Sequence, residues 1–99
     1  PHVYVVNSGI TALQQALLMA ERLRDSLPFL RIMTHCGGGG LRSQFKKADR
    51  SGARWAVILG EQEIAEHTVG VKDLRGEVEQ QTIPQVDLAA FLGTRLKTD

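Results

Sequence analysis

The chain has 99 residues, 42% of them hydrophobic and 23% charged, which predicts one soluble globular domain and excludes a disordered or collagen-like chain. Its formal net charge is +1, and its single cysteine, Cys36, cannot form a disulfide within the chain, so we expect a reducing compartment, the cytoplasm. Apolar runs such as residues 56–59 are far too short to span a membrane. The start at Pro1-His2, directly before a strand-like run, is typical of a domain cut from a longer protein.

The first part of the chain reads as strand, helix, strand. Residues 3–6 form a β-branched run that predicts a buried strand, and we expect a second strand over residues 30–34. The helix between them begins near Thr11, which has capping-box spacing with Gln14, and it ends before Pro28, which lacks the amide hydrogen that a helix needs. Its predicted apolar stripe consists of Leu13, Ala16, Leu17, Ala20, Leu23 and Leu27.

A second helix follows the glycines of residues 37–40 and ends at Ser51-Gly52. One side of this helix is predicted to carry Leu41, Phe45, Ala48 and Gly52. The other side carries cations at four-residue intervals, with a fourth a little around from them: Arg42, Lys46, Arg50 and Lys47.

The remaining elements complete an α/β fold. Residues 54–59 predict a central strand covered on both faces, and residues 61–67 a short helical turn. Residues 68–74 alternate as a strand, and a tight turn at Arg75-Gly76 predicts an antiparallel edge strand over residues 78–83. Pro84 and Asp87 introduce a last helix.

The resulting prediction is a single domain over residues 1–99 with three α/β/α layers. Its five-stranded mixed sheet has three parallel strands and an antiparallel fourth strand, and three helices cover its faces.

The strongest local motif is the glycine-rich loop that leaves the second strand and opens the cationic helix. Backbone amides at such a helix start favour anions, so we expect Gly38, Gly39 and Gly40 to contact phosphate; a connector without a ligand is the alternative. The loop is neither a P-loop nor a dinucleotide fingerprint, because Arg42 stands where those motifs require other residues. The cations beside it favour a phosphate or nucleic-acid backbone site over a merely solvated helix face.

The sequence contains little that indicates a catalytic or metal-binding site. Cys36 and His35 are neighbours on an extended strand, so their side chains point to opposite faces, and the three histidines have no ligand spacing. Glu61 and Glu63 follow the central strand, where they could accept a hydrogen bond from guanine's amino group or simply be exposed. Gln44, on the helix flank, could offer its amide to a base edge.

The stretch from His35 to Ala53, with its glycine tetrad and its Gln-Phe-Lys-Lys-Ala-Asp run, resembles the C-terminal anticodon-binding domain of bacterial histidyl-tRNA synthetases. The resemblance continues through Leu-Gly-Glu-Gln-Glu at residues 59–63 and Thr-Val-Gly-Val-Lys-Asp-Leu at residues 68–74. The sequence departs from the family near Arg75, where the turn arrives early and extra residues precede the glutamines.

The resemblance implies that the domain binds the anticodon loop of histidine tRNA. The positions that match the family's base-reading surface are Gln44, Lys47, Glu61, Glu63 and Lys72, whereas Arg42, Lys46 and Arg50 would meet phosphates. It also implies a homodimeric parent ligase whose ATP- and Mg²⁺-dependent catalytic domain precedes this one in the same chain. This domain itself is expected to hold no catalytic residue, cofactor or metal. A small-nucleotide-binding domain and an accessory module of the same fold are the alternatives.

Overall fold

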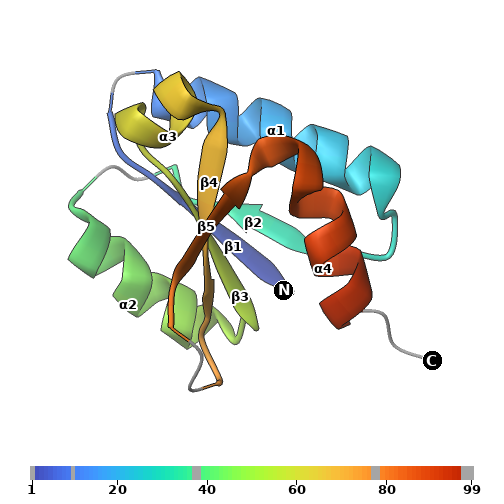
Figure 1. Ribbon diagram of the computed structural model, residues 1–99. Coiled ribbons are helices and arrows are strands. Elements are labelled where there is room, and N and C mark those ends of the chain that lie inside the picture. The colour runs from blue at the N-terminus through green and yellow to red at the C-terminus, as the bar shows by residue number, and fades with distance from the viewer. Residues whose placement is uncertain (1, 10, 37–38, 77–78, 97–99) are drawn as a thin grey trace.

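The computed structural model describes residues 2–9, 11–36, 39–76 and 79–96. Five strands form one mixed sheet in the order β2-β1-β3-β4-β5 (Figure 1). β1 pairs in parallel with β2 and β3, whereas β4 runs antiparallel to both β3 and β5. The predicted mixed sheet is confirmed, with its strands at Val3–Asn7 (β1), Ile32–Thr34 (β2), Trp55–Leu59 (β3), Thr68–Asp73 (β4) and Gln81–Pro84 (β5).

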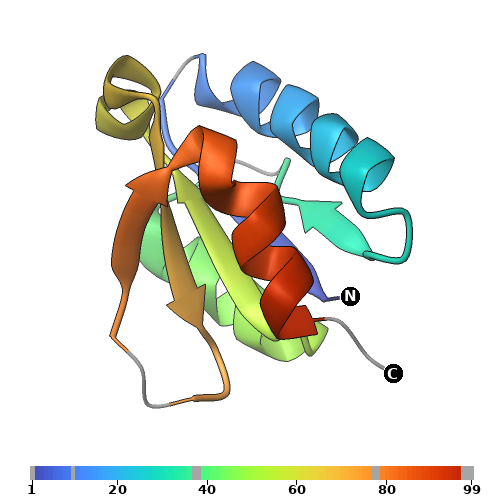
Figure 2. The same ribbon diagram turned by 45° about the vertical axis from the view of Figure 1, so that its right-hand side comes forward.

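The helices cover the sheet unequally. One face carries α1, α3 and α4, and the other face carries α2, which gives the three predicted layers (Figures 1 and 2). The turn expected at residues 61–67 is a helix of its own, so the described part of the chain has four α-helices rather than three. Their bounds are Ala12–Ser26 (α1), Leu41–Ser51 (α2), Glu61–Glu66 (α3) and Leu88–Leu96 (α4), with a 3-10 turn, Gln85–Asp87, before α4.

Alanines, more than leucines, bring α1 against the sheet. Its buried residues are Ala12, Ala16, Ala20 and Leu23, whereas Leu17 is 47% exposed. The predicted stripe was therefore wrong at Leu17, because small side chains let the helix approach the strands closely and large ones at this position face outward. The expected capping box is also absent, since the side chain of Thr11 makes no capping hydrogen bond.

The strand β3 is buried along its whole length, as predicted for a central strand. Successive residues contribute to opposite faces, so Val57 packs in the larger core under α1 and α4 while Ile58 packs under α2. This alternation fixes the strand register and places the ends of β1 and β3 side by side, with Asn7 opposite Leu59.

The β4–β5 hairpin differs from the sequence prediction. Val71 pairs with Gln81, so β5 begins three residues later than the expected strand over residues 78–83. No two-residue turn closes the hairpin at Arg75-Gly76, because the carboxylate of Asp73 accepts both backbone amides, at 3.0 Å and 2.9 Å. Residues 77–78 lie outside the described residues.

In the parts of the chain that the structure covers, every helix is too short or too polar to cross a membrane.

Candidate nucleic-acid interface

The glycine-rich loop after β2 leads directly into the first turn of α2. Gly39 adopts a positive φ of 87°, and Gly40 is the N-cap of the helix, with an extended backbone at φ −74° and no capping side chain. The first amides of α2 therefore lack the side-chain partner that serine or aspartate would supply, and such amides favour an anion. Gly38, which we also expect to contact phosphate, lies outside the described residues.

The surface of α2 is densely cationic. The structure exposes the four side chains that the sequence places there: Arg42, Lys46, Lys47 and Arg50. The only salt bridge among the described residues joins Arg54 to Asp73, so no neighbouring carboxylate pairs with any of the four. Arg42 and Arg50 are about 12 Å apart along the helix axis, at 1.5 Å per residue. The positive charge therefore extends along most of the helix.

Gln44 does not lie where the sequence prediction places it. Its side chain is only 1% exposed. Its Oε1 accepts a hydrogen bond from the amide of Asn7 at 2.9 Å, and its Nε2 donates to the carbonyls of Asn7, at 2.7 Å, and Gly39, at 3.0 Å. Burial of this amide contradicts the expectation that Gln44 offers it to a base. Helical spacing could assign Gln44 to a flank, but only the packing of α2 on the sheet shows that this flank faces inward.

The two glutamates after β3, Glu61 and Glu63, differ in solvent exposure and in hydrogen bonding within the protein. Glu61 is exposed and packs over Gly9, where an added Cβ would lie 2.6 Å from the glutamate Cγ. Glu63 is half-buried, and its Oε1 accepts the backbone amide of Gly60 at 2.9 Å. Glu63 therefore caps the start of α3, and of the two glutamates Glu61 is the more accessible to a partner.

Lys72, on β4, lies beside α2. Its ammonium group lies 5.1 Å from the ring centroid of Phe45, in a cation–π contact, and the side chain remains exposed. This contact places Lys72 beside the cationic helix although the two are far apart in the sequence.

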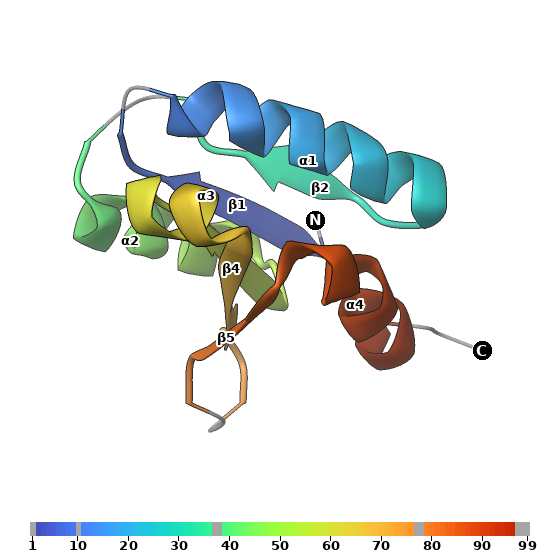
Figure 3. The same cartoon turned by 45° about the horizontal axis from the view of Figure 1, so that its top comes forward.

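Several of the predicted site residues lie at one end of the sheet. Asn7 ends β1, and its side-chain amide donates to the carbonyl of His35 at 2.8 Å, while its backbone binds Gln44. Figure 3 shows the starts of α1, α2 and α3 at this same end. The glycine loop, Arg42 and Glu61 therefore share one edge, whereas Arg50 lies toward the opposite end of α2. Ligands of open α/β sheets bind at this edge, the carboxyl end of the parallel strands.

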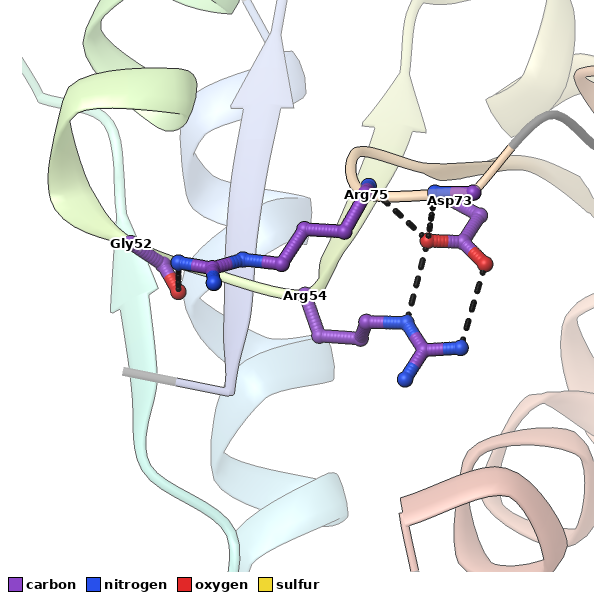
Figure 4. Close-up of polar contacts among 5 residues, drawn as sticks. Gly52, Arg54, Asp73 and Arg75 are labelled. Atoms are coloured by element: carbon purple, nitrogen blue, oxygen red, sulfur yellow. Dashed lines mark hydrogen bonds and ion pairs between the residues drawn. The ribbon is translucent and has the colours of Figure 1, made fainter.

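A second polar cluster, which the sequence reading missed, fixes the far end of α2. Asp73 is buried and accepts hydrogen bonds from Arg54 Nε at 3.0 Å and from a terminal guanidinium nitrogen of Arg54 at 3.2 Å, while Arg75 donates to the carbonyl of Gly52 at 3.0 Å (Figure 4). The Arg54 hydrogen bond, with the amides of Arg75 and Gly76, lowers the pKa of Asp73 against the opposing effect of burial. The turn-forming run Asp73-Leu74-Arg75-Gly76 was the available signal, because aspartate accepts amides two residues on.

The structure also bears on the Cys36 and His35 pair. The hydroxyl of Tyr4 lies 2.8 Å from Nδ1 of buried His35, and burial raises the pKa of Tyr4. Cys36 is exposed, and its thiol donates to the carbonyl of Thr34. His35 is therefore buried whereas Cys36 is exposed, and the two side chains have different hydrogen-bond partners. Within the described residues, no group of three potential metal ligands comes together.

A hollow of about 740 Å³ lies on the other face of the sheet, between α1 and α4, and is lined by Ser26, Leu27, Phe29, Ala89, Ala90, Gly93 and Thr94. None of the described residues that line it is ionisable, and the sheet separates it from α2.

The chain is similar to curated and solved proteins of translation. It is 49% identical over 90 residues to a histidine–tRNA ligase of Legionella pneumophila (strain Paris), covering 91% of this chain but only 21% of that protein. It superposes with a TM-score of 0.86 and 33% identity on histidyl-tRNA synthetase from Nostoc sp. PCC 7120, covering 96% of this chain and 22% of that one.

The fold also recurs at low sequence identity. The RNA-binding domain of threonyl-tRNA synthetase from Cryptosporidium parvum Iowa II superposes with a TM-score of 0.84 at 10% identity, over 94% of this chain and 23% of that one. The family model described as "Anticodon binding domain" matches residues 2–95, almost the whole of the chain. The chain therefore belongs to the anticodon-binding domain family.

Proposed function

We propose that this domain binds the anticodon stem-loop of histidine tRNA and so contributes tRNA recognition to a histidine–tRNA ligase. The observation that carries the proposal is the unpaired positive charge of α2 beside an uncapped, glycine-rich helix start, in a chain of this family. Phosphate groups attract such charges and the released counterions favour binding.

The proposal extends to the parent protein. The chain spans 21% of the length of the Legionella relative, so a longer parent chain has ample room for a separate catalytic domain. We propose that this parent performs ATP- and Mg²⁺-dependent aminoacylation as a homodimer in the cytoplasm. Within that parent, we propose recognition as the role of this domain.

We assign two roles to the surface. The glycine-loop amides and the outer cations of α2 hold the RNA backbone; these residues are Gly39, Gly40, Arg42, Lys46 and Arg50. The residues proposed to meet bases are Lys47, Glu61, Glu63 and Lys72. Glu61 can accept from a base amino group, and Lys72 can donate to a ring nitrogen or carbonyl. Gln44 takes no part in base contact because its amide is bonded within the protein.

Binding of the 99-residue chain to the anticodon stem-loop of histidine tRNA tests the proposal. We expect affinity to fall with salt with a log–log slope of roughly −3, about 0.7 for each of four phosphate contacts to single-stranded RNA. A changed anticodon base should weaken binding by about tenfold, the factor for one lost base contact. Equal affinity for an unrelated hairpin, or a thermal shift with free nucleotides but none with RNA, would contradict the proposal.

Substitutions should separate the two roles. Lys46→Ala should weaken all hairpins by a similar factor and reduce the salt slope by about 0.7, because it removes a phosphate contact. Lys72→Ala and Glu61→Ala should instead reduce the ratio of affinities between the correct and the changed anticodon. Fluorescence anisotropy with both hairpins measures each quantity. A change of base preference caused by Lys46→Ala alone would show that the roles are wrongly divided.

A further inference from the structure

We infer that Gln44 is the positioning residue that fixes the start of α2, and with it the glycine loop and Arg42, against the end of β1. The expected effect on RNA affinity rests on the proposed function. The placement of α2 by Gln44 rests only on the hydrogen bonds of Gln44. No base or phosphate contact is assigned to this residue.

The geometry around Asn7 explains why an amide is needed. Within β1, the backbone groups of Val5 face β2, where the amide of His35 donates to the carbonyl of Val5 at 2.9 Å. Alternate residues of a strand direct their backbone groups to the same side, so those of Asn7 also face this side, two residues further on. The parallel pairing of β1 with β2 ends at Thr34, opposite Val5. The carboxamide of Gln44 meets both backbone groups of Asn7, at 2.9 Å and 2.7 Å, and so replaces the peptide group of a neighbouring strand.

The same carboxamide reaches forward to the loop. Its Nε2 also donates to the carbonyl of Gly39, at 3.0 Å, so one side chain joins the end of β1 to the glycine loop. The backbone of α2 starts at Leu41, three residues before Gln44, so the first turn of the helix is held between these contacts. An RNA that needs Arg42 and the loop amides in one arrangement binds more weakly when that arrangement is only part of the population.

The isosteric change Gln44→Glu tests this directly. Glutamate keeps the acceptor for the Asn7 amide, but its second oxygen would face the carbonyls of Asn7 and Gly39, which repel a carboxylate. At neutral pH we expect the stem-loop affinity to fall about tenfold, the factor for a lost buried hydrogen bond. Burial raises a carboxyl pKa, and the protonated acid can again donate, so the ratio of wild-type to variant affinity should shrink as the pH falls from about 8 to about 5.

Two matched variants separate positioning from charge and from stability. Thr94→Glu adds the same negative charge at an exposed position of α4. Leu92→Val lowers stability by a change in the core under α4, on the opposite face of the sheet from α2. Neither should change RNA affinity or its pH profile relative to the wild type. If Gln44→Glu binds RNA as Thr94→Glu does at every pH, the inference is overturned.

Amide hydrogen exchange by NMR provides a measurement that needs no RNA. In the wild-type chain, the Gln44 side-chain amide and the Asn7 backbone amide should exchange slowly, whereas the side-chain amide of exposed Gln15 should exchange rapidly. Gln44→Glu should speed exchange in the first turns of α2 and leave α1 and α4 unchanged. Rapid exchange of the wild-type Gln44 amide would overturn the inference, whereas a wild-type chain that does not bind RNA would count against the proposed function only.

Discussion

Gln44 and Asp73 are polar side chains buried at opposite ends of α2, and each binds several backbone groups. Gln44 holds the start of the helix to β1, while Asp73, through its turn and Arg75, holds the end of the helix near Gly52. A buried polar group is costly unless it is hydrogen-bonded, so both residues contribute to one fixed placement of the helix. The role of Gln44 could not be predicted from the sequence, because glutamine is found mostly on surfaces and only the assembled sheet shows that this one turns inward. For Asp73 the sequence indicated a turn, but not the burial of its carboxylate.

Removal of the Asp73 carboxylate should destabilise the domain. Asp73→Ala leaves the amides of Arg75 and Gly76 without their acceptor, so we expect the free energy of unfolding to fall by about 2 kcal/mol in urea titrations. The contribution of Arg54 is smaller because its side chain is 49% exposed and solvent screens the pair. The exposed acid Asp25 offers a control, since Asp25→Ala should change stability by less than about 0.5 kcal/mol. Equal effects of the two substitutions would show that the Asp73 cluster contributes nothing particular.

The carboxylate of Asp73 should make the free energy of unfolding depend on pH. Its folded pKa is lowered, first by the Arg54 hydrogen bond, so its stabilising effect is complete above the unfolded pKa of about 3.9 and is lost as the pH falls through the lower folded value. The difference in unfolding free energy between wild type and Asp73→Ala should therefore be constant near neutrality and shrink below about pH 4. A difference that grows on acidification would contradict this assignment.

At the scale of the elements, strands were easier to predict than the inward faces of helices. The run from Trp55 to Leu59 is apolar at every position, so either orientation gives a buried strand. In α1, by contrast, alanines and leucines form overlapping apolar stripes. The predicted stripe included Leu17, which is exposed, and left out Ala12, which is buried. The start of β5 at Gln81 also differs from the predicted strand, which began at residue 78.

The glycines at the two ends of α2 should respond differently to substitution. Gly52 ends the helix at φ 80°, a left-handed conformation that disfavours other residues, so Gly52→Ala should lower the free energy of unfolding by about 1 kcal/mol. Gly40 has an ordinary extended backbone, and an added Cβ would meet no atom within 4 Å. Gly40→Ala should therefore cost less, about 0.5 kcal/mol, chiefly because alanine is a poor N-cap. Thermal unfolding of both variants compares them, and a larger loss for Gly40→Ala would reverse this interpretation.

For the whole molecule, the net charge of +1 conceals a strong asymmetry. The cations lie on α2, which covers one face of the sheet. The acids of α3 lie on the helix that follows β3 and packs on the other face. The sequence predicted the cationic face of α2, because residues at four-residue intervals share one side of a helix. It could not place Lys72 beside Phe45, since that contact depends on how β4 crosses the layer under α2.

The position of β1 in the sheet has a consequence for how the chain folds. The first strand of the chain lies between β2 and β3, and Val3 pairs with residues as far along as Trp55. The strands β3, β4 and β5 follow one another as antiparallel neighbours, whose contacts are local and inexpensive in loop entropy. During synthesis β1 must therefore wait, unpaired on its β3 side, until most of the domain has emerged. The pairing of β1 with β3 would join the two parts of the sheet, and the edge that contains the end of β1 would form only at that step.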